Sequence, residues 1–218
     1  FKKMTGRLEA CIRLAEKVRV KNKRILDVGC SYPWFIEYAL KHGAKSASGV
    51  EPDDRKVKAA QKQVPKAKII QGYAGELKFA TGSMDLVTLF DVIEHVPVNT
   101  EQKVFFEINR VLTKGGNLII STPYSHIVAK LTDPAWYFGH RHYSEDQLTE
   151  MLKTAGFNVK TVVTHGGIWE IIGMWVLYIS KWLLRIKMPF ENWFDSKRKK
   201  EFKSRGLTHI MLIAQKTT

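Results

Sequence analysis

The sequence predicts an α/β fold in which helices cover both faces of a doubly wound, mostly parallel sheet. Short apolar runs alternate with helix-like stretches along the chain, an order that right-handed crossovers convert into neighbouring parallel strands. One apolar run ends on Asp27 and turns at Gly29 into a helix-like stretch, and the next run ends on Glu51. This arrangement is typical of a nucleotide-binding α/β unit.

The expected strands are short apolar runs bounded by turn-forming or charged residues. Five of them alternate with helices, and two more follow near the end of the chain. They are Ile25–Val28, Ala47–Val50, Lys68–Gln71, Asp85–Phe90, Asn117–Ser121, Phe157–Thr164 and Thr208–Gln215.

Helices are expected where apolar residues recur at helical spacing and capping signals mark the ends. Pro33 suits the first turn of a helix that stops before Gly43, and Ser144 begins a capping box with Gln147. The expected helices cover residues 5–20, 34–42, 52–63, 100–112 and 144–155.

Composition favours one globular domain over the whole chain, residues 1–218, of which 44% is hydrophobic. Two cysteines, Cys11 and Cys30, fit neither a disulfide framework nor a metal knuckle, so we expect a cytoplasmic protein. The net charge of +14 lies at the ends: residues 1–24 carry +7, residues 25–180 are neutral and residues 181–205 carry +6. Such segments attract phosphate-rich partners, among them anionic membrane surfaces, or serve as a solvated basic surface.

The turn after the first strand predicts the ligand class. Gly29 lets the backbone approach a ligand, and Glu51 ends the next strand where a carboxylate can bind ribose hydroxyls. Ser31 and Pro33 stand where a dinucleotide fingerprint has glycines. We therefore expect an adenosine compound without a pyrophosphate.

Seven segments in order resemble the class I S-adenosylmethionine-dependent methyltransferases, especially the broad small-molecule group that includes quinone-biosynthesis enzymes. The likeness spans about residues 22–165 and the last strand. The segments are Asp27-Val-Gly29-Cys, Val50-Glu51-Pro52, Gly75–Val87, Phe90-Asp-Val-Ile-Glu-His-Val96, Arg110–Gly116, Ser121-Thr-Pro123 and Ala155-Gly-Phe157.

The resemblance implies a Rossmann-like, seven-stranded sheet of order 3-2-1-4-5-7-6 and S-adenosylmethionine as cofactor. It implies that Glu51 holds both ribose hydroxyls and that Asp91 lies near the methionine end of the cofactor. The turn is poorer in glycine than is usual in the family, and Tyr73 stands where relatives often have an acid that reads adenine. The expected cofactor-binding residues are Asp27, Gly29, Cys30, Ser31, Glu51, Tyr73, Ala74 and Asp91.

The candidate catalytic residues are histidines that follow the fourth and fifth strands: His95, His140 and His142. A histidine can act as general base because its ordinary pKa lies near working pH. Asp91, Glu94 and His95 also resemble the metal-binding signature of some quinone O-methyltransferases, but we expect no metal, because many relatives use Glu-His here to line the cofactor.

An insertion between the sixth and seventh strands, residues 166–206, is rich in aromatic and basic residues. On a helical wheel, residues 169–186 show a broad apolar face and a narrow strip of Glu170, Lys181 and Arg185. Three charges argue against a spanning helix. The insertion is expected to be a lid over the substrate, an interfacial helix on a membrane, or a dimer contact. A basic helix within residues 1–22 is expected at the other end.

The leading hypothesis is methyl transfer to a small-molecule acceptor, with a hydroxyl of an apolar, lipid-linked or glycan molecule favoured. The basic charge suggests a nucleic-acid methyltransferase instead, but neither an Asn/Asp-Pro-Pro-aromatic run nor a Pro-Cys nucleophile is present, so nucleic acid is not the expected partner. A non-catalytic cofactor-binding scaffold is the third possibility. The expected assembly is a monomer or homodimer in the cytoplasm, with peripheral contact to a membrane as an option.

Overall fold

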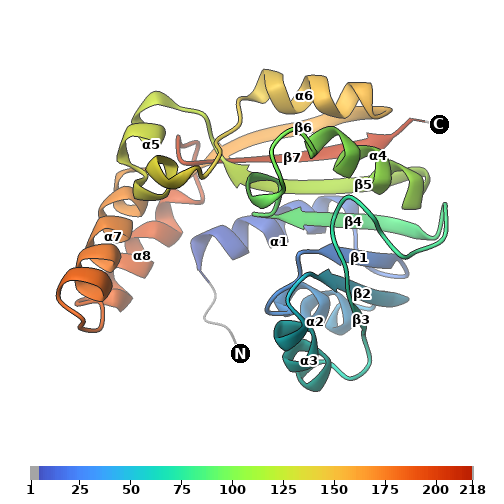
Figure 1. Ribbon diagram of the computed structural model, residues 1–218, viewed down its shortest axis with the longest axis horizontal. Helices are drawn as coiled ribbons and strands as arrows, with labels where there is room; N and C mark the ends of the chain where they lie inside the picture. Colours follow the sequence, from blue (N-terminus) through green and yellow to red (C-terminus); the bar gives the residue numbers. More distant parts are fainter. Residues whose placement is uncertain (1–4, 218) are drawn as a thin grey trace.

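The computed structural model describes residues 5–217 and shows one sheet with helices on both faces (Figure 1). Its seven strands lie in the order β3-β2-β1-β4-β5-β7-β6, as the sequence predicts. They are β1 (Arg24–Val28), β2 (Ser46–Glu51), β3 (Lys68–Gln71), β4 (Met84–Phe90), β5 (Leu112–Pro123), β6 (Phe157–His165) and β7 (His209–Lys216). Only β7 runs against its neighbours β5 and β6.

The five expected helices are present, each with ends within two residues of the predicted ones. The helices are α1 (Gly6–Val18), α2 (Trp34–Lys41), α3 (Asp54–Gln63), α4 (Glu101–Val111), α5 (Ile127–Thr132), α6 (Glu145–Thr154), α7 (Ile168–Tyr178) and α8 (Glu191–Glu201). Short 3-10 turns cover Ile93–His95 and Pro134–Phe138, and a π-helical turn covers Ile179–Leu183. The expected basic helix within residues 1–22 corresponds to α1, although residues 1–4 lie outside the described part.

Two apolar clusters, one on each face of the sheet, build the core. Alternate strand residues point to opposite faces, so Leu26 joins one cluster while its neighbour Ile25 joins the other. Helices α4 and α6 cover the first face, and α1, α2 and α3 cover the second. This double cover explains why the central strands are apolar on both sides.

The strand order reverses between β1 and β4, and this reversal determines where the candidate site lies. Strand β1 pairs in parallel with β2 on one side and with β4 on the other. The connections from β1 and β4 therefore leave in opposite directions, and a crevice opens at the carboxyl ends of these strands.

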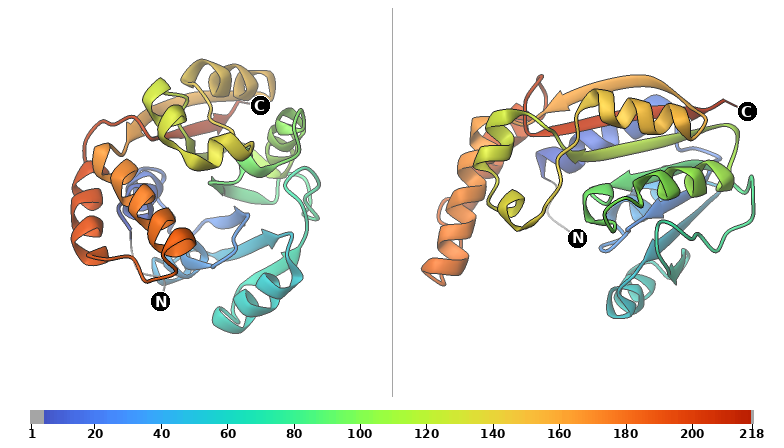
Figure 2. Two further views of the ribbon diagram at one scale, coloured as in Figure 1. Left: turned by 60° about the vertical axis from the view of Figure 1, so that its left-hand side comes forward. Right: turned by 45° about the horizontal axis from the view of Figure 1, so that its top comes forward.

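The insertion between β6 and β7 forms two packed helices, not the single helix that the apolar run suggested. Helix α7 ends at Tyr178, the π-helical turn follows, and α8 begins at Glu191. The pair projects beyond the end of the sheet, beside α5 (Figures 1 and 2). In the described part of the chain, no helix has both the length and the apolar character needed to cross a bilayer.

Candidate active site

A cavity of about 470 Å³ opens at the carboxyl ends of β1, β2 and β4. Val28 and Gly29 form its floor, Tyr73 and Ala74 lie on the side that follows β3, and His95 lies at the end that follows β4. Most of its surface is apolar, which suits a flat aromatic base more than a charged phosphate chain.

The turn at Gly29 is shaped for close approach. Gly29 has φ +76°, and a Cβ there would lie 2.3 Å from Cγ2 of Val92. The amides of Gly29 and Cys30 both donate to the carbonyl of Val50, at 2.8 and 3.1 Å. These bonds hold the end of β1 against the end of β2, and only glycine fits both the left-handed backbone and the contact.

Glu51 reaches from the end of β2 to the same turn. Its carboxylate accepts hydrogen bonds from the backbone amides of Ser31, at 3.1 Å, and of Asp53, at 3.2 Å. The Glu51 residue is only 4% exposed, and Nζ of Lys56 lies 3.8 Å from Oε1. Glu51 thus lies next to the predicted nucleoside site, although it is not among the residues that line the cavity.

Two other residues predicted to bind the cofactor have buried side chains. Asp27 accepts a hydrogen bond of 2.6 Å from Oγ1 of Thr88, and burial raises the pKa of its carboxyl to about 7. The thiol of Cys30 faces Gly49 and Ile36, and burial raises its pKa. Because both side chains are buried, we expect any contact of these two residues with a ligand to come from their backbone.

A second cavity, of about 370 Å³, lies between the ends of β4 and β5, the loop that follows β5, and α7. Asp91, Glu94 and four histidines supply much of its polar lining, and α7 and α5 contribute apolar side chains together with Glu170 and Thr132. His95 lines this cavity as well as the first one. The two cavities therefore meet at His95.

Asp91 lies at the start of the second cavity in a strained backbone conformation. Its φ is +54°, which is uncommon for a residue other than glycine. One carboxylate oxygen accepts from Oγ of Ser121 at 3.0 Å, and the other pairs with Nε of Arg7 at 3.1 Å. The strain turns the carboxylate of Asp91 toward the cavity instead of along β4.

Glu94 lies beneath His95. It is 4% exposed and accepts a hydrogen bond of 3.0 Å from Oγ1 of Thr122. Burial, and then the negative charge of Asp91, raises the pKa of its carboxyl to about 8. The carboxyl of Glu94 therefore holds its proton more tightly than an ordinary glutamate, which favours the neutral form that can donate a hydrogen bond.

An aspartate holds two of the three predicted histidines. Oδ2 of Asp133 lies 3.2 Å from Nδ1 of His140 and 2.9 Å from Nε2 of His142, whose Nδ1 lies 3.1 Å from the carbonyl of Tyr124. Partial burial alone would raise the pKa of Asp133, but the hydrogen bonds of the two histidines outweigh it and hold the pKa well below its usual range.

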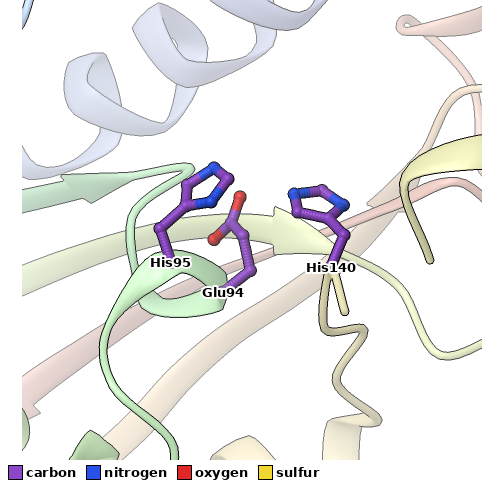
Figure 3. A group of neighbouring side chains, drawn as sticks. All are labelled: Glu94, His95 and His140. Atoms are coloured by element: carbon purple, nitrogen blue, oxygen red, sulfur yellow. The ribbon is translucent and has the colours of Figure 1, made fainter. Parts of the chain in front are cut away.

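His95 faces His140 across the cavity, with ring centroids 5.0 Å apart (Figure 3). Burial, and then the positive charge of a protonated His140, lowers the pKa of His95. The three residues predicted as catalytic, His95, His140 and His142, thus lie in one cavity, as the loop order suggested.

The same cavity contains side chains that could hold a metal ion. Glu94, His95 and His140 offer ligand atoms that lie within 4.8 Å of one another, and so do Asp133, His140 and His142. Such mixed nitrogen and oxygen sets suit a borderline divalent ion. The expectation that no metal binds remains a prediction.

A model of the methyltransferase domain family matches residues 2–162 of the chain. The chain belongs to the S-adenosylmethionine-dependent methyltransferases. The match covers the strands and turns that form the first cavity and ends within β6, before the insertion.

Relatives support the same assignment. This methyltransferase is 32% identical over 152 residues to a probable S-adenosylmethionine-dependent methyltransferase of Mycolicibacterium smegmatis, which covers 68% of this chain and 58% of the relative. It is 30% identical over 147 residues to one of Mycobacterium tuberculosis, covering 66% and 52%. A ubiquinone biosynthesis O-methyltransferase of Coxiella burnetii is 26% identical over 113 residues, or 50% of this chain and 47% of that protein. The matched part spans about half the length of these curated relatives.

The fold is shared with solved structures. The crystal structure of an S-adenosylmethionine-dependent methyltransferase from Mesorhizobium loti superposes with a TM-score of 0.70 at 15% identity, covering 97% of this chain and 98% of that one. The predictions of the family, the Rossmann-like fold with its strand order, and S-adenosylmethionine as the cofactor are confirmed.

The first cavity fits this cofactor. Its apolar walls suit adenine, and the carboxylate of Glu51 lies at the turn where ribose hydroxyls are bound in such folds. Tyr73 is 69% exposed and Ala74 half-buried, so the backbone near them is open to a base. The individual contacts of Asp27, Gly29, Cys30, Ser31, Glu51, Tyr73, Ala74 and Asp91 with the cofactor remain predictions.

Sequence reasoning missed several residues of the second cavity. Asp133 holds two of the predicted histidines, and Arg7 contacts both Asp91 and Nε2 of His209, the latter at 3.1 Å. His209 also lines the cavity, and burial lowers its pKa to about 4. The Asp-Pro pair at residue 133 was the one local signal, because it marks a turn beside the histidines.

Proposed function

We propose that this chain transfers the methyl group of S-adenosylmethionine to a hydroxyl oxygen of an apolar or lipid-linked small molecule. The acceptor occupies the second cavity. The observation that carries the proposal is the position of His95 in both cavities, because a methyl group has to cross from one ligand to the other at such a junction. Holding the two reactants in line accounts for a large part of such a barrier, on the order of 7–11 kcal/mol.

The walls of the second cavity support an apolar acceptor with one polar end. Ile171 and Met174 of α7 and Ala129 of α5 form an apolar side. The histidines, Asp91 and Glu94 supply polar lining, and Glu170 of α7 adds a carboxylate that pairs with Arg198. A ring or chain that rests on the apolar side would direct its hydroxyl toward His140.

His140 is the general base in this proposal. Its Nδ1 donates to Asp133, which leaves Nε2 free to take a proton, and the Asp133 carboxylate stabilises the imidazolium that results. The cofactor supplies an activated methyl group. Both ring nitrogens of His142 face acceptors, Asp133 and the carbonyl of Tyr124, so we assign His142 the positioning of Asp133.

The proposal that oxygen is the methylated atom depends on His140 acting as a general base. Relatives include both an O-methyltransferase of Coxiella burnetii and a C-methyltransferase of Campylobacter jejuni, each named for quinone biosynthesis. A hydroxyl requires a group that removes its proton, and the pair of His140 and Asp133 supplies one.

The test uses methyl-labelled S-adenosylmethionine and the chloroform-soluble extract of cells. We expect label in the apolar fraction that survives mild alkali, because an ether is stable where an ester is not. The variant His140→Ala is expected to bind the cofactor and to transfer label at least about a hundredfold more slowly. Label in RNA, or cofactor binding without transfer to any fraction, would contradict the proposal.

A further inference from the structure

The end of the molecule formed by α7, the π-helical turn and α8 carries an unusual number of exposed apolar side chains. Trp182 is 73% exposed, Leu183 75% and Phe190 78%. We call residues 168–190 the tip. The tip projects away from the sheet in Figure 1 and in the right-hand view of Figure 2. Apolar surface of this kind marks an interaction site in a folded protein.

The exposed residues of the tip form a stripe at helical spacing. Ile168, Ile172, Trp175, Ile179 and Trp182 follow one another at intervals of four and three residues, and their exposed fractions run from 37% to 73%. An ordinary surface helix places polar residues at these positions. Here the outward face of α7 is apolar throughout.

The inner face of α7 already has a role, so the stripe is not explained by closure of the cavity. Glu170, Ile171, Met174 and Tyr178 line the second cavity. The lid function expected of the insertion is therefore supported by one face of α7, and the stripe lies on another face.

Helix α5 and the turn that follows it extend the apolar surface. Nε1 of Trp175 donates to the carbonyl of Thr132 at 2.9 Å, which joins α7 to α5. Beside this contact, Leu131 is 56% exposed, and Ile127 at the start of α5 is 70% exposed. The hydrogen bond also satisfies the indole N–H, so the ring of Trp175 can leave water without an unpaired donor.

The charges around the stripe are of one sign. Between residues 171 and 190 the chain has Lys181, Arg185 and Lys187 but no acidic residue. All three cations are exposed, and Nζ of Lys181 lies 5.9 Å from the Trp182 ring. Long basic side chains at the border of an apolar face suit the headgroup region of an anionic bilayer.

We propose that the tip docks the molecule on an anionic phospholipid surface, with α7 lying in the plane of the interface. Trp175 and Trp182 reach the boundary between headgroups and acyl chains, while Lys181, Arg185 and Lys187 contact lipid phosphates. A second copy of the chain is the competing occupant of this surface, and the experiments below separate it from a bilayer. The docking stands on this surface alone and does not depend on the proposed methyl transfer.

Binding to vesicles tests the contribution of the apolar side chains of the tip to docking. The probes are vesicles of phosphatidylglycerol with phosphatidylcholine, and vesicles of phosphatidylcholine alone. The wild-type chain is expected to pellet with the anionic vesicles, and the double variant Trp182→Ser/Leu183→Ser to bind at least about tenfold more weakly, because two large side chains no longer enter the interface. Phe106→Ser is the matched control, since Phe106 is 51% exposed on α4, away from the tip.

The charge part has its own pair of variants. Lys181→Glu/Arg185→Glu is expected to reduce binding to anionic vesicles by about tenfold or more, because each basic residue near such a surface contributes appreciably. Lys66→Glu, on an exposed turn before β3, is expected to change binding little. Far-UV circular dichroism and melting curves confirm that every variant is folded.

Two results would overturn the docking. One is equal pelleting of wild type and Trp182→Ser/Leu183→Ser. The other is a concentration-dependent dimer in light scattering that the same substitutions abolish, with no binding to vesicles. Cofactor binding, measured by calorimetry without vesicles, reports on the proposed function separately, so failure of one proposal is distinguishable from failure of the other.

Discussion

Single residues in rare backbone conformations shape this site. Gly29 and Ser31 after β1, and Asp91 after β4, all have positive φ, of 76°, 35° and 54°. Each follows a strand that ends at the crevice, so the chain bends where ligands bind instead of continuing along the strand direction. The surrounding hydrogen bonds, such as that from the Ser31 amide to Glu51, hold these conformations.

The first prediction concerns Gly29→Ala. The added methyl would meet Val92 at 2.3 Å and would sit on a left-handed backbone, so the turn has to shift. We expect affinity for S-adenosylmethionine to fall at least about tenfold, measured by isothermal titration. Gly82→Ala is the control: its φ is +64°, but nothing lies within 4 Å, so it shares the backbone strain and should keep its affinity. Equal loss in both variants would contradict the role of the turn.

The second prediction separates the role of His140 as a base from any role in binding the cofactor. His140→Ala is expected to lower kcat by about 10²–10⁴-fold and to leave the affinity for the cofactor nearly unchanged, because His140 acts on the acceptor's proton. The control is His126→Asn in the same loop, where asparagine can still cap α5. Single-turnover transfer to the acceptor provides kcat. A loss of cofactor affinity equal to the loss of kcat would show that His140 supports the fold of the site instead.

The third prediction concerns stability against pH. Burial raises the pKa of Asp27 to about 7 from 3.8, so the folded state holds this proton more tightly than the unfolded state. The contribution of the Asp27 proton to stability is fully present below pH 3.8, the ordinary pKa of an aspartate. It is lost as the pH rises through about 7, the pKa of Asp27 in the folded state. We expect the free energy of unfolding to decline over this range, and Asp27→Asn to flatten the decline. If the stability of Asp27→Asn fell with pH as steeply as that of the wild type, ionisation of Asp27 would not be the cause of the decline.

The sequence could predict the residues of the site that occur in local motifs. Gly29, Glu51 and His95 each follow a strand within a recognisable segment. Arg7 and His209 could not be found in this way, because they meet only when α1 and the start of β7 come together, 202 residues apart. Pairing at such a distance leaves no periodic signal in the chain.

At the scale of elements, most boundaries were predictable because caps and glycines mark them. The capping box of Ser144 begins α6, and β3 has the expected ends. Strand β5 begins at Leu112 and not at Asn117, since Leu112 pairs with Met84, and regular pairing resumes at Asn117 after a register shift that includes Gly115, with φ +73°, and Gly116. Glycine normally weakens a strand, which is why the pattern placed the start too late.

The insertion was harder to predict because its apolar pattern continues through the break. No glycine or proline lies between Gly173 and Pro189, yet the regular helix ends at Tyr178 in a π-helical turn. Helix α8 packs back against α7. Arg198 of α8 reaches Glu170 of α7, with Nε 2.6 Å from Oε2, and so joins the two helices.

The fourth prediction tests what fixes the insertion to the domain. Phe202, directly after α8, is 1% exposed and belongs to the core cluster beneath α1. Phe202→Ala is expected to reduce the free energy of unfolding by about 3–5 kcal/mol, measured by chemical denaturation. Trp193 on α8 is 47% exposed, so Trp193→Ala should reduce the free energy of unfolding far less. A similar small cost for both would mean that α8 is held by its ion pairs instead.

At the scale of the whole molecule, folding brings together the two basic segments that the sequence keeps apart. Helix α1 packs against α8, where Nζ of Lys199 lies 2.7 Å from Oε1 of Glu9. Residues 25–180 are neutral and form most of the sheet, whereas residues 181–205 carry +6 and lie mainly at the end of the molecule that carries the tip (Figure 1). A field of this shape orients the molecule toward a negatively charged surface before contact.

The last prediction follows from this asymmetry and concerns salt. Screening shortens the reach of the field, with a Debye length of about 10 Å at 0.1 M and about 3 Å at 1 M salt. We expect binding to phosphatidylglycerol vesicles to weaken about tenfold over this range without vanishing, because the apolar stripe of Ile172, Trp175 and Trp182 does not depend on charge. Complete release at 1 M salt would show that the cations act alone and that α7 does not enter the interface. Cofactor affinity, measured over the same range, should change little, since the walls of the first cavity are mainly apolar.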